Sequence, residues 1–186
     1  MLNQSVSLKK PVHVRQTEIK TYDLGAHQVL VEATLRDTRT PPPSGEPPEG
    51  QMVLVHDLVA RIYVQGPDLT IVAVEAEMPH IPRDMCREVL PDIQRLVGIK
   101  IISGYTQKVK DLIGDVKGCS HLTHLFIVLG PAAVQGYWAA YGRQPGARSL
   151  ANPAVARVID SCRVWRRDGP LVRSLAAEAQ KTRRET

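Results

Sequence analysis

The sequence has 186 residues, of which 43% are hydrophobic and 23% are charged. These proportions are ordinary for a globular protein, and they exclude wholesale disorder, a collagen-like chain and a coiled-coil rod. Aromatic residues make up only 4% of the chain, which disfavours a nucleic-acid module built on stacked aromatic side chains.

The net charge of +5 is concentrated at the C-terminal end. Residues 143–186 contain ten Lys and Arg against four Asp and Glu, whereas the rest of the chain has 14 basic and 15 acidic residues. Such a segment can bind phosphates or anionic surfaces, although a solvated helix face is the simpler interpretation. We therefore expect a core domain over residues 1–142 and a basic helical arm over residues 143–186.

Three features bear on the compartment. No stretch approaches the roughly 18 apolar residues of a membrane span, and residues 1–10 lack the apolar region of a secretory signal. The chain has three cysteines, an odd number that indicates a reducing compartment without a disulfide framework. We expect a cytoplasmic protein that binds neither membranes nor nucleic acid.

The first half of the chain predicts strands, because β-branched residues and loose alternation recur between turn residues. A proline-rich segment, Thr38–Gly50, is expected to be an extended loop, and Gln65–Asp68 a hairpin turn. These signals favour an antiparallel meander. The predicted strands are His13–Thr21, Val29–Leu35, Met52–Val64 and Leu69–Ala76.

The second half predicts helices, with a break or kink at Pro131 and a linker over Gly142–Pro153. Strands followed by helices predict an α+β fold, in which helices cover one antiparallel sheet. The apolar stretch Leu122–Tyr141 is expected in the core, and a homodimer face is the alternative. The predicted helices are Arg83–Val97, Tyr105–Ile113, Ser120–Leu129, a segment from Pro131 to Tyr141, and Pro170–Thr182.

The most informative residues for chemistry are Cys119 and His121. Cys119 stands directly before a predicted helix, where backbone N–H groups and the helix dipole favour a thiolate. A thiolate and an imidazole in one neighbourhood suit zinc or ferrous iron. The alternative is a packed thiol beside a histidine at the helix start. His124, one turn further on, is expected to face solvent or a neighbouring loop.

A second candidate is the pair His56 and Asp57 inside an apolar strand. Adjacent strand residues point to opposite faces, so only one of the two can face a given site. A carboxylate in such a strand is costly unless it is paired or bound to metal, although a bulge or a sheet edge would expose it.

The other two cysteines are weaker candidates. Cys86 lies near the start of the first predicted helix, where ordinary packing is the alternative to metal binding. Cys162 is expected to pack against the body beside Trp165. The chain has no phosphate-binding loop, no Gly-x-Ser-x-Gly and no His-Glu-x-x-His motif, which disfavours a serine hydrolase and a zincin.

Taken together, the motifs resemble an uncharacterised bacterial family with an Ile-His-Asp-Met strand and a Gly-Cys-Thr-His-Leu signature. The resemblance covers roughly His13 to Val172, and this chain departs from it at Val55, Leu58 and Ser120. The name of that family implies no reaction. The matching segments are His56–Asp57, Cys86, Leu96–Gly98, Gly104–Thr106, Gly118–Leu122, Ala132–Ala139, Asp160–Cys162 and Arg167–Pro170.

A weaker resemblance is to the NifU/IscU-type iron–sulfur scaffold proteins, in which an aspartate and three cysteines hold zinc or an assembling cluster. It implies a NifU/IscU-like core, with Asp57, Cys86 and Cys119 as ligands. Val55 stands where the remaining cysteine would be, and His121 or His56 could replace it. A mixed shell of this kind suits a single zinc or iron ion better than a cluster, which prefers thiolates.

We therefore expect one divalent zinc or iron ion per chain, held by Asp57, Cys86, Cys119 and His121. In this hypothesis the protein is a mononuclear metalloenzyme, and His56 is the catalytic residue that moves protons. The reaction would be of the lyase, decarboxylase or hydrolase type on a small metabolite, with an aromatic compound among the candidates. The alternatives are a metal or iron–sulfur carrier, a structural zinc site in a binding module, and a metal-free protein with packed cysteines.

Overall fold

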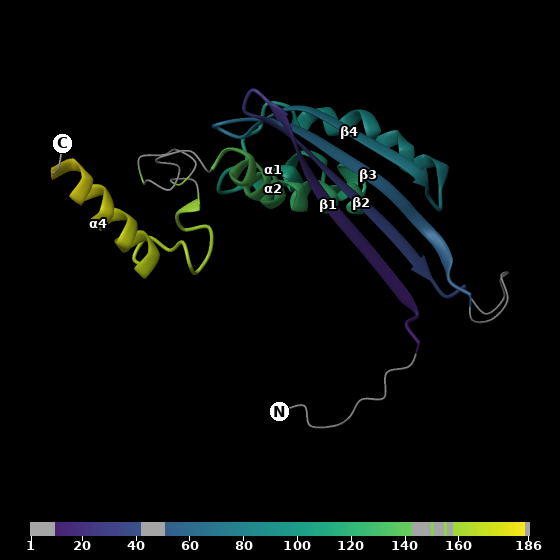
Figure 1. The fold of residues 1–186 in the computed structure, drawn as a ribbon. Helices are drawn as coiled ribbons and strands as arrows, with labels where there is room; N and C mark the ends of the chain where they lie inside the picture. Colours follow the sequence, from purple (N-terminus) through teal and green to yellow (C-terminus); the bar gives the residue numbers. More distant parts are fainter. Residues whose placement is uncertain (1–9, 42–50, 143–149, 151–154, 156–157, 185–186) are drawn as a thin grey trace.

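The structure is a computed structural model that describes residues 10–41, 51–142, 150, 155 and 158–184. Its centre is one four-stranded antiparallel sheet in the order β1-β2-β3-β4 (Figure 1). Each strand pairs with the next one along the chain, which confirms the predicted meander. The strands are β1 (His13–Gly25), β2 (Gln28–Arg39), β3 (Val53–Gln65) and β4 (Thr70–His80).

The sheet has one apolar face, and strict alternation in β2 and β3 produces it. Within Val29–Leu35 and Leu58–Val64, every second residue is apolar and completely buried, whereas the residues between them are partly exposed. Side chains on a strand point to opposite faces in turn, so this pattern assigns one face to the core. The buried residues are Val29, Val31, Ala33, Leu35, Leu58, Ala60, Ile62 and Val64.

Helical segments cover that apolar face, as expected for an α+β fold. Helix α2 (Ser120–Tyr141) packs against β1, β2 and β3, and η1 (Asp84–Leu96) packs against β4. Helix α1 (Tyr105–Ile113) contacts both η1 and α2, and the short η2 (Asp115–Lys117) follows it. The prediction of one sheet covered by C-terminal helices is thus confirmed.

Two predicted helices differ from the structure in detail. The segment predicted as an α-helix over Arg83–Val97 is a 3-10 helix, and it contains Pro91. Proline has no N–H for the α-helical hydrogen-bond pattern, which favours the tighter turn. Of the break or kink predicted at Pro131, the break was wrong, because α2 runs through this residue as one helix.

Helix α2 is fixed against α1 near Pro131. The Tyr105 hydroxyl donates a hydrogen bond of 2.7 Å to the Phe126 carbonyl. The Tyr105 ring lies against Gly130, where a Cβ atom would approach it to 2.3 Å. Burial of the phenol raises the pKa of Tyr105 well above its usual range. The glycine therefore allows the close packing of α1 on α2 that positions the N-terminus of α2.

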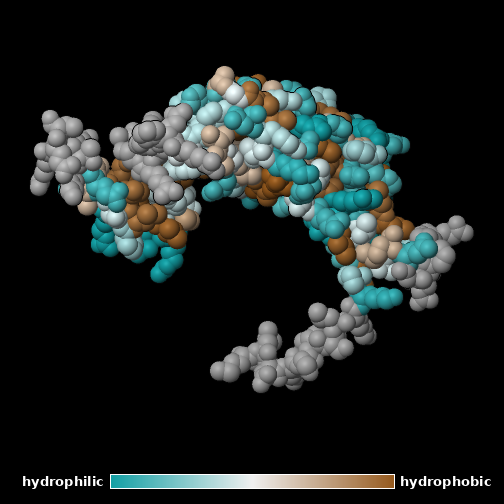
Figure 2. All heavy atoms as spheres, viewed as in Figure 1, coloured by the Kyte–Doolittle hydropathy of each residue, from teal (hydrophilic) through white to brown (hydrophobic). Residues whose placement is uncertain are grey.

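The C-terminal helix, α4 (Pro170–Arg184), lies apart from the sheet (Figure 1). Trp165 lies in the segment that precedes α4. Its ring contacts the Trp138 ring of α2, with centroids 6.4 Å apart. Polar and apolar side chains both show on the segment (Figure 2). Most of the predicted proline-rich loop and most of the predicted linker lie outside the described residues. Among the described helices, none is long and apolar enough to cross a membrane.

Candidate metal centre

The apolar face of the sheet ends in a group of polar side chains. On β2, the alternation that buries Leu35 continues to Asp37, which is only 2% exposed. On β3, His56 follows the same alternation from Leu58, and the strand register places it directly opposite Asp37. On β1, Arg15 is the register partner of Asp37 on the other side. Three neighbouring strands therefore direct one polar residue each to the same place.

Asp37 is the centre of this group. Arg15 donates two hydrogen bonds to its carboxylate, from Nε at 2.7 Å and from Nη2 at 2.6 Å. His56 Nδ1 lies 3.2 Å from Asp37 Oδ2, and the half-exposed His13 lies 3.4 Å from Oδ1 through its Nε2 atom. A buried carboxylate requires partners of this kind, because isolated charge is costly away from water.

These partners keep Asp37 ionised. The hydrogen bonds from Arg15 lower the pKa of Asp37 to about 2, against the opposing effect of burial. The charge of Arg15 and the hydrogen bond with His56 act in the same direction. The group is therefore a carboxylate with negative charge at any pH near neutrality.

The N-terminus of α2 adds a second histidine. Cys119 is the N-cap residue of α2, and the Thr123 hydroxyl anchors this turn by donating to the Cys119 and Ile113 carbonyls at 2.9 and 2.8 Å. One residue into the helix, His121 Nε2 lies 3.6 Å from Asp37 Oδ2. The His121 and His56 rings are in contact, with centroids 3.9 Å apart and planes tilted by 37°.

Burial and neighbouring positive charge favour a neutral His121. Burial is the largest cause that lowers the pKa of His121, and the charges of His56 and Arg15 lower it further. A neutral imidazole has a lone pair for a metal ion. On the other side of the ring, Nδ1 lies 3.8 Å from Cys119 Sγ.

The ligand atoms of Asp37, His56 and His121 all lie within 4.8 Å of one another, and among the described residues they are the one group of three or more potential metal ligands. Two atoms bound to one zinc ion at about 2.0–2.2 Å lie roughly 3–3.5 Å apart in tetrahedral geometry. The separations of 3.2 and 3.6 Å from Asp37 Oδ2 agree with that spacing. Because a carboxylate has about four lone-pair sites, Asp37 can accept from Arg15 and still bind a cation. The residues present therefore fit a divalent ion.

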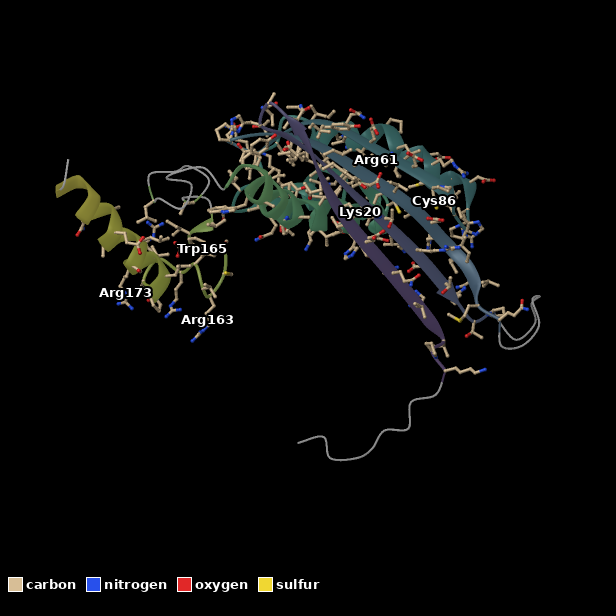
Figure 3. All side chains as sticks on the ribbon, in the orientation of Figure 1. Lys20, Arg61, Cys86, Arg163, Trp165 and Arg173 are labelled. Atoms are coloured by element: carbon tan, nitrogen blue, oxygen red, sulfur yellow. The ribbon has the colours of Figure 1, made fainter. Side chains whose placement is uncertain are left out.

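The structure brings together only part of the predicted ligand set. His56, Cys119 and His121 lie side by side, as described above. Asp57 is the next residue after His56 on β3, and adjacent strand residues point to opposite faces, so Asp57 lies on the face that it shares with Arg61. Cys86 lies on η1 and packs, partly buried, against the core beside β4 (Figure 3).

Asp37 and Arg15 are functional residues that were not predicted from the sequence. The predicted second strand ends at Leu35, although the alternation of Val29, Val31, Ala33 and Leu35 continues to Asp37 and would have placed this carboxylate on the apolar face. For Arg15 the sequence contains no comparable signal, because β1 is largely exposed and alternates weakly.

Two minor expectations can also be compared with the structure. His124 is exposed, as predicted. Cys162 is exposed as well, so its predicted packing against the body was wrong. Trp165 is the residue of that segment that makes a contact with the body.

Fold and site together define an α+β protein with a cluster of one buried carboxylate and two partly buried histidines at the end of its sheet. Residues 13–135 match the family described as "Protein of unknown function (DUF2889)", and the chain belongs to this family. The matched span contains every residue of the cluster. No curated protein and no solved structure matches the chain.

The family match confirms that the chain belongs to an uncharacterised family, as the resemblance implied. The comparisons give no support to the two signatures by which that family was recognised. The NifU/IscU similarity, and with it the NifU/IscU-like core, also receives no support.

Proposed function

We propose that this protein binds one divalent zinc or iron ion through Asp37, His56 and His121. The observation that carries the proposal is the convergence of these three donors within 4.8 Å at the end of an otherwise apolar sheet face. Two histidines and one carboxylate are a ligand set for catalytic zinc and for non-haem iron. Of the predicted ligands Asp57, Cys86, Cys119 and His121, the proposal keeps only His121 and adds Asp37 and His56.

The surrounding residues take supporting roles in this proposal. If His121 binds the ion through Nε2, then Nδ1 carries the ring proton and donates a hydrogen bond to Cys119 Sγ. This hydrogen bond would fix the orientation of the imidazole ring. Arg15 holds both oxygens of Asp37 and so fixes the carboxylate. Cys119 and Arg15 are then positioning residues, and His56 is a ligand instead of the predicted proton carrier.

We infer further that the centre is catalytic, of the lyase, decarboxylase or hydrolase type on a small metabolite. Three protein ligands leave at least one position for water or substrate, where a metal ion polarises a carbonyl or generates hydroxide. His13, half exposed and close to Asp37 Oδ1, is placed to move a proton between this position and solvent.

Elemental analysis of untagged protein, purified without chelator, tests the site. We expect about one zinc or iron ion per chain, lost in Asp37→Asn, His56→Gln and His121→Gln. Matched controls lie close by in the sequence. Asp57→Asn changes a carboxylate on the opposite face, His124→Gln changes an exposed histidine one turn along α2, and Cys86→Ser changes the thiol on η1. All three variants should keep the metal.

Two outcomes would contradict this proposal. Absence of stoichiometric metal from fresh, reduced protein would remove the metal centre altogether. Loss of metal in the Asp57→Asn and Cys86→Ser variants, with retention in Asp37→Asn, would instead restore the ligand set expected from the sequence. Circular dichroism of each variant separates loss of a ligand from loss of the fold.

A metal carrier is the second candidate, and the solvent exposure of the site's outer side favours it. His13 and Arg15 have side chains 50% and 39% exposed, so an acceptor protein could approach Asp37 from that direction. A dilute chelator distinguishes the two candidates. A carrier should lose its ion within minutes, whereas a catalytic centre should retain it through gel filtration.

A further inference from the structure

Strand β1 is an unpaired edge of the sheet. It is 13 residues long, and among the described strands it pairs only with β2. A long edge strand offers a row of free backbone donors and acceptors, which natural proteins normally shorten, cover or pair. Neither proline nor a bulge interrupts β1 between His13 and Asp23.

The hydrogen-bond pattern shows which residues of β1 face outward. The Thr40 N–H donates to the Val12 carbonyl at 2.9 Å, and these residues are directly opposite each other in the register of β1 and β2. In an antiparallel pair of strands, hydrogen-bonded pairs of opposite residues alternate with pairs that are not hydrogen-bonded to each other. Even-numbered residues of β1 therefore bond to β2, and odd-numbered residues such as Thr17, Ile19 and Thr21 direct N–H and C=O away from the sheet.

The sequence of β1 is complementary to itself when two copies run antiparallel. Ile19 is the central residue of the strand, so pairing about Ile19 overlaps all 13 residues. In that register, Glu18 lies opposite Lys20 of the second copy, and twofold symmetry repeats this contact. Shifting the centre to Glu18 or to Lys20 would instead place two like charges opposite each other, which is destabilising.

Helix α2 supplies an independent observation on the same side of the molecule. It lies against β1, where Thr21 Oγ1 is 3.5 Å from the Ala132 carbonyl and a Cβ atom on Gly136 would meet the Thr21 side chain. None of its 22 residues is Asp, Glu, Lys or Arg. Its exposed positions Pro131, Gln135 and Ala139 are thus uncharged, although a helix side left to solvent is normally charged or polar.

We propose that two copies of this chain pair along β1, centred on Ile19, and form a continuous eight-stranded antiparallel sheet. A twofold axis perpendicular to the sheet keeps both copies of α2 on the same face, beside each other over the joined strands. The interface combines backbone hydrogen bonds from the outward residues with the two Glu18–Lys20 ion-pair positions and the uncharged sides of α2. Lys20, on this edge, is labelled in Figure 3.

Sedimentation over a range of protein concentrations, with charge-reversed variants, tests the pairing. We expect a dimer for the unchanged chain. Glu18→Lys and Lys20→Glu each place like charges opposite each other twice, so each should weaken the dimer about tenfold. The double variant Glu18→Lys/Lys20→Glu restores opposite charges and should restore the dimer. Glu88→Lys, a charge reversal on η1, is the matched control and should leave it unchanged.

Glu18 and Lys20 also form an ion pair within the chain, at 2.8 Å, but the loss of this pair does not affect how the test is interpreted. Both side chains are more than half exposed, so their pair contributes little to folding, and the measurement reports association. Hydrogen exchange gives a second readout, because the Thr17, Ile19 and Thr21 amides should be protected only at dimer-forming concentrations. A monomer at every concentration would overturn the proposal. So would a dimer whose affinity neither single charge reversal changes, or a double variant that does not regain the dimer.

Discussion

The two ends of the helix-facing side of the sheet differ sharply in chemistry, although the same strands build both. Toward the hairpin that joins β1 and β2, this face is apolar and completely buried, from Val29 to Leu35 on β2. Two residues further along the same strand, the face carries Asp37. The same strands run through both ends, and the side chains that they carry distinguish one end from the other.

The comparison shows two ways of filling a buried position. In the apolar part, removal of surface from water supplies the stabilisation, at about 25 cal/mol per Å². At the polar end, Asp37 is as well buried as its apolar neighbours. It is tolerated there because Arg15 and His56 satisfy its oxygens. A polar cluster of this cost at the edge of a core is typical of functional sites.

The largest expected effect comes from the apolar end. Leu35 is completely buried, so Leu35→Ala should lower the free energy of unfolding by about 2–5 kcal/mol, through lost burial and the cavity left behind. Val59, on the other face of the sheet, is only partly buried, and Val59→Ala should cost about 1 kcal/mol or less. Urea denaturation measures both. Equal losses would show that the outer face is also covered.

An intermediate effect is expected from acid at the polar end. Because the pKa of Asp37 is lowered to about 2 in the folded protein, its ionised form stabilises the fold above the unfolded pKa of about 3.9. This contribution, of about 2 kcal/mol, should be lost as the pH falls from about 4 toward 2. Urea denaturation of metal-free protein across this range measures the loss.

The control for the acid experiment is Asp37→Asn, which cannot ionise at this position. Its stability should be lower at neutral pH and should change less between pH 4 and pH 2 than that of the unchanged chain. If both proteins lose stability in parallel, other carboxylates dominate the acid unfolding and the pairing of Asp37 with Arg15 contributes little.

The smallest expected effect concerns Cys119. If this thiol only orients His121, then Cys119→Ala should weaken zinc affinity about tenfold, as replacement of an outer-shell partner commonly does. Competition with a zinc-binding dye measures the change. The exposed Cys162→Ala is the control and should leave the affinity unchanged. Complete loss of metal in Cys119→Ala would instead make Cys119 a direct ligand, as the sequence analysis expected.

Much of the fold was predictable because local patterns agree with it. The alternation in β2 and β3 predicted strands with one buried face, and the glycine after Ile113 coincides with the end of α1. The helix break predicted at Pro131 does not occur, because the contacts of Tyr105 with Phe126 and Gly130 hold α2 together through that position. Proline inside a helix is tolerated where tertiary contacts stabilise the helix on both sides.

The candidate site was predictable only in part. Cys119 and His121 were recognised because they stand together at a helix start, and the rule of alternating faces allowed only one of His56 and Asp57. That rule could not choose between the two, since the choice depends on the face that α2 covers. Asp37 lies 19 residues before His56 in the sequence, and only the register of β2 and β3 makes them neighbours.

The sequence by itself determined the class of fold, the order of its elements and the presence of a cysteine and a histidine at the start of α2. These depend on periodicity and on local capping, which act over a few residues. The tertiary structure alone decided that Asp37 and not Asp57 joins the histidines, and that β1 remains an open edge. Strand register and helix packing bring distant residues together, and a local pattern does not contain that information.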